Sequence, residues 1–101
     1  MIAEIQVLPD PLGTETDHYA HVDAAIAVIQ TSGLNHEVGA LGTTIEGSTD
    51  QVWHVLRQVH EATLAAGART TVTIIKVVDA TPGPGAPTMS DLTDKFRGGD
   101  G

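Results

Sequence analysis

Five histidines are the side chains of this 101-residue chain that first suggest chemistry, because imidazole binds metals and moves protons near neutral pH. His18 and His21 lie one helical turn apart, and Asp17 is adjacent to the first. A zinc site is built from three or four protein ligands, and no third ligand is predicted near this pair. His54 and His60 are expected on different faces of one helix. The histidines therefore predict no metal site.

No catalytic set is recognisable among the other side chains. The chain has no cysteine, which excludes a disulfide framework, a thiolate zinc site and a cysteine nucleophile. No nucleophile is found with a base and an orienting group. The loop at residues 9–15 has no arginine to hold a phosphate, as an acylphosphatase would need. We therefore expect a protein that binds a small molecule and is not an enzyme, with no catalytic residues and no cofactor.

The charge balance narrows the class of partner. Five lysines and arginines stand against thirteen aspartates and glutamates, a formal net charge of −8. Binding of nucleic acid needs basic side chains for the phosphates, so this balance argues against it. No segment approaches the roughly 20 apolar residues of a membrane span, and no basic stretch precedes an apolar run at the N-terminus. We expect a cytoplasmic protein without a nucleic acid or membrane partner.

The elements that would position a site follow from the spacing of apolar residues, which has period two in strands and about 3.6 in helices. Thr14 or Thr16 is expected to cap the first helix, Gly33 follows it, and Gly67 closes the second. In chain order we expect a strand at 2–8, a helix at 16–32, hairpin strands at 34–38 and 41–46, a helix between 48 and 67, and a strand at 70–78.

This order, βαββαβ, predicts an α+β ferredoxin-like sandwich, in which a four-stranded antiparallel sheet carries both helices on one face. Residues 1–79 are expected to form this domain. Residues 80–101 are expected to be a Pro/Gly-rich C-terminal segment with a short helix at 89–96 and a disordered end.

Two helices on one face leave the other face of the sheet uncovered. Such a face, with carboxylates beside apolar residues, predicts a subunit interface or a ligand platform, and simple exposure to water is the alternative. Alternation assigns to the helix side Ala3, Ile5, Val7, Val38, Ile45, Val72 and Ile74. It assigns to the open face Glu4, Gln6, Glu37, Thr44, Glu46, Thr71, Thr73 and Ile75.

Several short strings together resemble the small thiamine-binding protein family, the YkoF-like proteins of ferredoxin-like fold. The most specific string is Gly-Thr-Thr-Ile-Glu-Gly at residues 42–47, and the others lie at 9–13, 14–19, 60–62, 66–69 and 73–77. The resemblance covers residues 1–79. It implies a small homo-oligomer, a homo-dimer or homo-tetramer through the open sheet face, that binds thiamine or a related hydroxymethylpyrimidine without chemistry.

The candidate ligand residues follow from the chemistry of thiamine, which joins a cationic thiazolium to a neutral aminopyrimidine. Glu46 would pair with the cation or accept from the amino group. Thr44 would offer a hydroxyl to the pyrimidine, and Tyr19 would stack or make a cation–π contact. The alternatives are a bridge from Glu46 to Lys76, ordinary strand threonines and a packed Tyr19. The candidate set is Thr43, Thr44, Glu46, Tyr19 and Thr73.

Two other functions predict different cavities. A dimeric α+β-barrel-type enzyme acting on a small hydrophobic substrate would have a deep apolar cavity between helices and sheet, whereas a thiamine binder would have a polar pocket at the sheet face. A structural oligomer without a ligand would bury that face and have no cavity.

Overall fold

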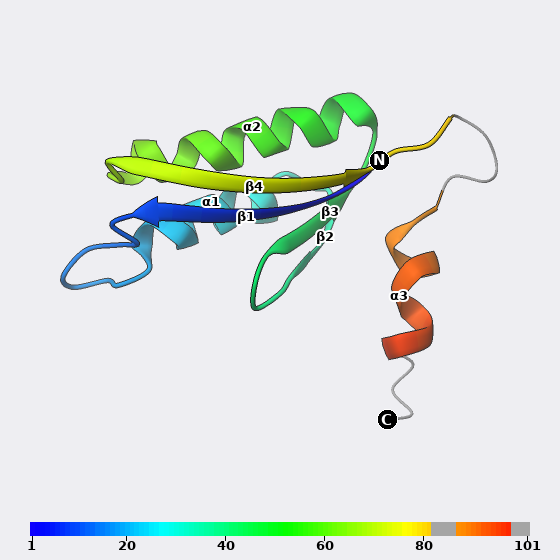
Figure 1. Ribbon diagram of the computed structural model, residues 1–101, viewed down its shortest axis with the longest axis horizontal. Coiled ribbons are helices and arrows are strands. Elements are labelled where there is room, and N and C mark those ends of the chain that lie inside the picture. The colour runs from blue at the N-terminus through cyan, green and yellow to red at the C-terminus, as the bar shows by residue number, and fades with distance from the viewer. Residues whose placement is uncertain (82–86, 98–101) are drawn as a thin grey trace.

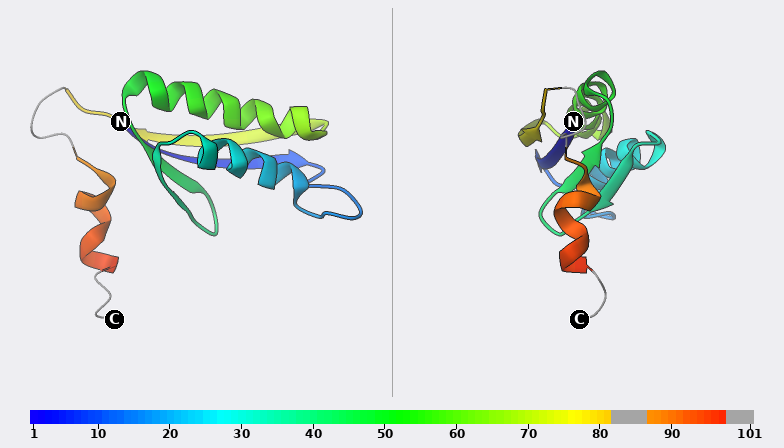
Figure 2. Two further views of the ribbon diagram at one scale, coloured as in Figure 1. Left: turned by 180° about the vertical axis from the view of Figure 1, so that it is seen from behind. Right: turned by 90° about the vertical axis from the view of Figure 1, so that its right-hand side faces the viewer.

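The computed structural model describes residues 1–81 and 87–97. Its elements are β1 (Ile2–Asp10), α1 (Ala20–Thr31), β2 (Asn35–Val38), β3 (Thr43–Glu46), α2 (Thr49–Ala66), β4 (Thr70–Val78) and α3 (Met89–Arg97). The strands form one antiparallel sheet in the order β2-β3-β1-β4. Helices α1 and α2 cover one face of it (Figures 1 and 2). The predicted ferredoxin-like α+β fold is confirmed.

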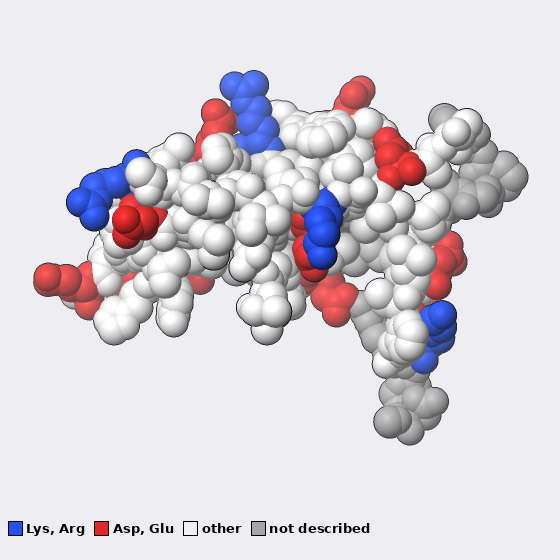
Figure 3. All heavy atoms as spheres, viewed as in Figure 1, with Lys and Arg blue, Asp and Glu red and all other residues white. Residues whose placement is uncertain are grey.

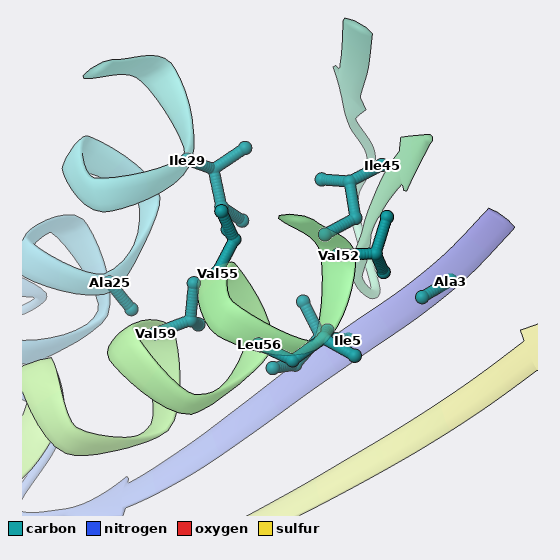
Figure 4. Packing of buried hydrophobic residues seen from close by; sticks show 9 residues of the cluster. All are labelled: Ala3, Ile5, Ala25, Ile29, Ile45, Val52, Val55, Leu56 and Val59. Carbon is teal, nitrogen blue, oxygen red and sulfur yellow. The ribbon is translucent and has the colours of Figure 1, made fainter. Parts of the chain in front are cut away.

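The core between the helices and the sheet is aliphatic. It joins residues of β1 and β3 to the inner sides of α1 and α2 (Figure 4). Ile29, Ile45 and Leu56 are among its largest fully buried side chains. The aromatic residues stay outside it: Tyr19, Trp53 and Phe96 are 60%, 50% and 79% exposed. The cluster consists of Ala3, Ile5, Ala25, Ile29, Ile45, Val52, Val55, Leu56 and Val59.

Strand β1 runs to Asp10, two residues beyond the predicted end, although it contains Pro9. Met1 and Gly47 exchange both of their backbone hydrogen bonds, at 3.0 and 3.1 Å. Successive residues of an antiparallel strand direct their backbone groups to alternate sides. The backbone N–H and C=O groups of the odd-numbered residues of β1 therefore point toward β3. Strand β3 pairs only with residues 2–5. The nitrogen of Pro9 therefore points to a side without a partner strand, and proline removes no hydrogen bond from the sheet.

Helix α1 begins at Ala20, four residues later than predicted, and neither Thr14 nor Thr16 caps it. The hydroxyl of Thr14 instead accepts from the backbone N–H of Asp17 at 3.0 Å, and its own N–H donates to the carbonyl of Asp17 at 2.8 Å. These two bonds close a local turn that competes with helix formation. Gly33 follows the helix end with a φ of +80°, a conformation that favours glycine.

Helix α2 has the ends that the sequence predicts. Ser48 accepts from the N–H of Gln51 at 3.2 Å, and the Gln51 side chain accepts from the N–H of Ser48 at 3.1 Å, which forms a capping box. Gly67 closes the helix with a φ of +128°.

The faces predicted for β4 are wrong. Ile5 pairs with Ile75 and Val7 with Thr73, and residues paired directly across two strands share a face. The Nδ1 atom of His60, on α2, lies 2.6 Å from the Thr73 hydroxyl, which places Thr73 under the helix. Because β-branched residues occupy both faces of β4, no polar–apolar contrast fixes its register. Thr71, Thr73 and Ile75 therefore lie on the helix side, and Val72 and Ile74 on the open face.

Helix α3 occupies Met89–Arg97, where the short helix at 89–96 was predicted, and projects from the body of the domain (Figure 1). Most of the predicted Pro/Gly-rich stretch and the predicted disordered end lie outside the described residues. Within the described ranges, no helix is long and apolar enough to cross a membrane.

Candidate functional site

The five predicted ligand residues do not meet at one place. Alternation along β3 puts Thr43 on the helix side, where it is buried, and Thr44 and Glu46 on the open face. Thr73 faces α2 and holds His60. Tyr19 is exposed in the loop before α1, whereas Glu46 pairs with the first residue of β1, at the other end of that strand.

Glu46 holds the C-terminal helix. One carboxylate oxygen accepts from the side-chain amide of Asn35 at 2.7 Å, and the other accepts from the backbone N–H of Met89, the first residue of α3, at 2.8 Å. A carboxylate is well placed at a helix N-terminus, where N–H groups lack helical partners. Lys76 pairs with Glu4 at 3.2 Å, so the bridge considered between Lys76 and Glu46 is not formed.

The histidines before and within α1 have different surroundings. His21 is buried, and its Nδ1 lies 2.7 Å from the carbonyl oxygen of Pro11, so it joins α1 to the preceding loop. His18 is exposed. No group of three or more histidine, aspartate or glutamate side chains with metal-binding geometry occurs in residues 1–81 and 87–97.

A cavity of about 160 Å³ opens between α1, β1 and the turn that joins β2 to β3. We call it the hairpin pocket. Val22 and Ile26 of α1 and Val7 of β1 contribute apolar walls, and Thr43 contributes a hydroxyl. The lining residues are Ile5, Gln6, Val7, Val22, Ala25, Ile26, Ile29, Gly39, Ala40, Leu41, Gly42, Thr43 and Val59.

The pocket exists because β1 is longer than β3. Beyond Ile5 the β2–β3 hairpin diverges from β1, as Figure 1 shows, and leaves one edge of β1 without a neighbour. Val7 is odd-numbered, so its N–H and C=O point toward this edge, and neither forms a hydrogen bond with another described residue. Thr43 of β3, which is 5% exposed, lines the pocket beside this edge. The free edge of β1 at Val7 and the side chain of Thr43 thus border a cavity with apolar walls.

A shallower hollow on the open face borders the same turn. It is lined by Glu4, Glu37, Thr44 and residues 39–42. Gly42 lies between the two cavities, and a Cβ atom there would approach the Ile5 carbonyl oxygen to 3.2 Å and the Glu4 side chain to 3.3 Å. Of the two carboxylates beside this turn, that of Glu4 is paired with Lys76 at 3.2 Å.

A mainly apolar cavity thus lies between α1 and the sheet, where the enzyme alternative predicted one, and a second hollow lies on the open face, where the pocket of a thiamine binder was predicted. Of the five predicted residues, Thr43 lines the first and Thr44 the second. The walls from Val22, Ile26 and Val7 were missed. The turn flanked by Gly39 and Gly42 is the sequence signal that could have indicated a pocket here, because glycines allow close approach of the backbone to a ligand.

Comparison with known proteins identifies the family. Residues 3–96 match the family model described as thiamine-binding protein. A UPF0045 protein of Clostridium perfringens is 29% identical over 93 residues, 92% of this chain and 93% of that protein. A domain of unknown function from Bacillus cereus superposes with a TM-score of 0.80 at 33% identity, covering 95% of this chain and 88% of that chain.

A solved Thermotoga maritima protein, provisionally assigned to thiamine biosynthesis or salvage, superposes with a TM-score of 0.73 at 23% identity. The match covers 95% of this chain and 97% of that chain, and at this identity it supports the fold alone. The family model spans nearly all of the described residues, including the turn and strands that form both cavities. The chain therefore belongs to the thiamine-binding protein family.

Proposed function

We propose that this protein binds thiamine, or a related hydroxymethylpyrimidine compound, in the hairpin pocket and releases it unchanged. The family match over residues 3–96 is the observation that carries the ligand class. The geometry of the pocket supports the location. The predicted cytoplasmic location stays a prediction.

The pocket suits the aminopyrimidine rather than the whole of thiamine. Its volume of about 160 Å³ is below the roughly 300 Å³ at which cavities for drug-sized ligands begin, so it accommodates a single ring. Val22 and Ile26 would contact the faces or edges of that ring. The N–H and C=O of Val7 would satisfy a ring nitrogen and the amino group, and the Thr43 hydroxyl would add a further hydrogen bond.

The thiazolium would then lie outside the pocket, near the turn. Glu37 and Glu4, whose carboxylate is paired with Lys76, border the hollow on the other side of this turn, and the chain carries a net charge of −8. The net charge disfavours a diphosphate and tolerates a cation. We therefore expect unphosphorylated thiamine to bind more tightly than thiamine diphosphate.

Two adjacent threonines allow a matched test by isothermal titration calorimetry with thiamine. Thr43→Val removes the hydroxyl in the pocket and should weaken binding about 2- to 10-fold, the equivalent of one hydrogen bond of roughly 0.5–1.5 kcal/mol. Thr44→Val makes the same change on the open face and should leave affinity unchanged. Weaker binding in Thr44→Val alone would move the site to the open face, and no heat at millimolar thiamine would refute the function.

The apolar cavity also fits a second candidate, the enzyme acting on a small hydrophobic substrate. Titration with thiamine, followed by mass spectrometry of the recovered ligand, separates the two. Saturable binding with full recovery of intact thiamine supports the binder, whereas no binding of thiamine at millimolar concentration supports the enzyme with a hydrophobic substrate.

The oligomer through the open face belongs to the same proposal. Leu8, Val72, Ile74 and Val78 are between 43% and 60% exposed on or beside this face, which is more apolar than predicted because β4 is turned over. A structural oligomer without a ligand would show the same assembly but no binding heat.

A further inference from the structure

The turn between β2 and β3 carries a large apolar side chain that is mostly exposed. Leu41 is 82% exposed, although it lines the hairpin pocket. The tip of this hairpin projects from the domain without a charged side chain, as Figure 3 shows. Removal of an exposed leucine from water is favourable. The pocket beside Leu41, with apolar walls from Val22 and Ile26, is a place where this side chain could be buried.

The register between β1 and β3 shows where Leu41 would lie if the two strands paired further. Their last pair is Ile5 with Thr43, and the hairpin diverges from β1 beyond it (Figure 1). In an antiparallel pair, each step forward on one strand is one step back on the other. Two further steps in the same register would therefore place Leu41 directly opposite Val7.

The backbone groups of both residues suit such a pair. The N–H and C=O of Val7 point toward the free edge of β1. The carbonyl of Gly42 points toward β2, where it accepts from the N–H of Gly39 at 2.9 Å. In an extended β3, the adjacent residue Leu41 would therefore direct its N–H and C=O toward β1. The pair of Val7 and Leu41 would satisfy the backbone groups of Val7 and leave the bond within the turn intact.

The same pair would place the side chain of Leu41 in the pocket. Val7 lies on the helix side of the sheet, since it pairs with Thr73, which contacts His60 of α2. Residues directly opposite each other on paired strands share a face, so Leu41 would also lie on the helix side. Its side chain would then occupy the space between α1 and the sheet. Ala40 would face the other side of the extended strand, because side chains alternate.

We propose that Leu41 is a built-in competitor of the ligand, which fills the hairpin pocket when β3 extends to pair with Val7. This inference rests on the proposed function, because the ligand would use the same apolar walls and the same backbone groups. The closed state buries a leucine, whereas the open state keeps the conformational freedom of Gly39 and Gly42. The structure is open, so the closed state has at most a comparable population. A ligand that binds only the open state shifts this equilibrium toward it.

The chain has no cysteine, so a pair of introduced cysteines can trap the closed pocket. In the closed state Val7 and Leu41 form a hydrogen-bonded pair with Cα atoms about 5.5 Å apart, a distance that a disulfide spans. Mild oxidation of Val7→Cys/Leu41→Cys at low concentration should therefore give an intramolecular disulfide. Val7→Cys/Ala40→Cys is the matched control, since Ala40 lines the open pocket but faces away in the closed state. Equal rates in the two variants, or no intramolecular disulfide in either, would overturn the closure.

Hydroxymethylpyrimidine tests whether closure and ligand binding compete in Val7→Cys/Leu41→Cys. At about ten times its Kd it should slow disulfide formation roughly tenfold. The oxidised variant should not bind it, and reduction should restore binding; circular dichroism verifies the fold of both forms. Equal binding by the oxidised and reduced forms would overturn the competition and leave the proposed function standing. If the wild-type protein binds neither thiamine nor hydroxymethylpyrimidine, the proposed function and the competition both fail, even where the disulfide forms selectively.

Discussion

A proline at residue 7 would separate the role of the β1 edge in binding from its role in folding. The N–H of Val7 points away from β4, toward the free edge of β1 that borders the hairpin pocket. Pro9 lies two residues on, faces the same side and is already part of the strand. Val7→Pro should therefore remove the backbone donor of the pocket and leave the pairing with β4 intact. Leu8→Pro is the matched control, because the N–H of Leu8 faces β4 opposite Val72.

The two proline variants should differ in their effects on the affinity for thiamine and on the free energy of unfolding. A ring nitrogen of the ligand that loses its donor inside an apolar cavity costs about 1–3 kcal/mol, so Val7→Pro should raise the Kd for thiamine roughly 5- to 150-fold. Its free energy of unfolding should fall only by the partial loss of packing of Val7 against the core. Leu8→Pro also breaks a bond between strands, which costs about 1–3 kcal/mol of stability in addition.

Titration calorimetry with thiamine and with hydroxymethylpyrimidine gives the affinities, and urea unfolding followed by circular dichroism gives the stabilities. The affinities for both ligands should fall by the same factor in Val7→Pro, since the proposed contact of Val7 is with the pyrimidine that the two ligands share. A folded Val7→Pro variant with wild-type affinity would refute the assigned site. A Leu8→Pro variant as stable as Val7→Pro would refute the assigned direction of the backbone groups.

Two further predictions concern the C-terminal helix and the core. Glu46→Ala removes the carboxylate that accepts from the Asn35 amide and from the backbone N–H of Met89, so hydrogen exchange of α3 should accelerate while that of α2 does not; equal exchange in the variant and wild type would show that Glu46 does not hold the helix. Leu56→Ala should lower the free energy of unfolding by about 2–5 kcal/mol, whereas Leu41→Ala, at a residue that is 82% exposed, should change it by less than about 0.5 kcal/mol in the same urea experiment.

The fold could be predicted because several levels of the sequence agree. Ser48 and Gly67 bound a helix whose apolar period fits one buried face, and the same residues cap it in the structure. The start of α1 could not be predicted from the threonines that precede it. The Thr14 hydroxyl accepts from the backbone N–H of Asp17 in a turn, and the same kind of hydrogen bond would cap a helix. The prediction of which β4 residues face the helices was wrong for a related reason. Both faces of β4 carry β-branched residues, so the sequence pattern is compatible with either register.

The site was harder to predict because much of it is backbone. Side-chain chemistry points to carboxylates such as Glu46, which the structure uses to hold α3. The hairpin pocket depends instead on a difference in strand length, and its donor and acceptor belong to Val7, whose side chain suggests no role in binding. Pro9 carries the relevant signal, since a proline late in an inner strand requires one side of that strand to be free. The side of β1 that accommodates Pro9 is the same side that borders the pocket. The greater length of β1 relative to β3 therefore accounts for both the proline and the pocket.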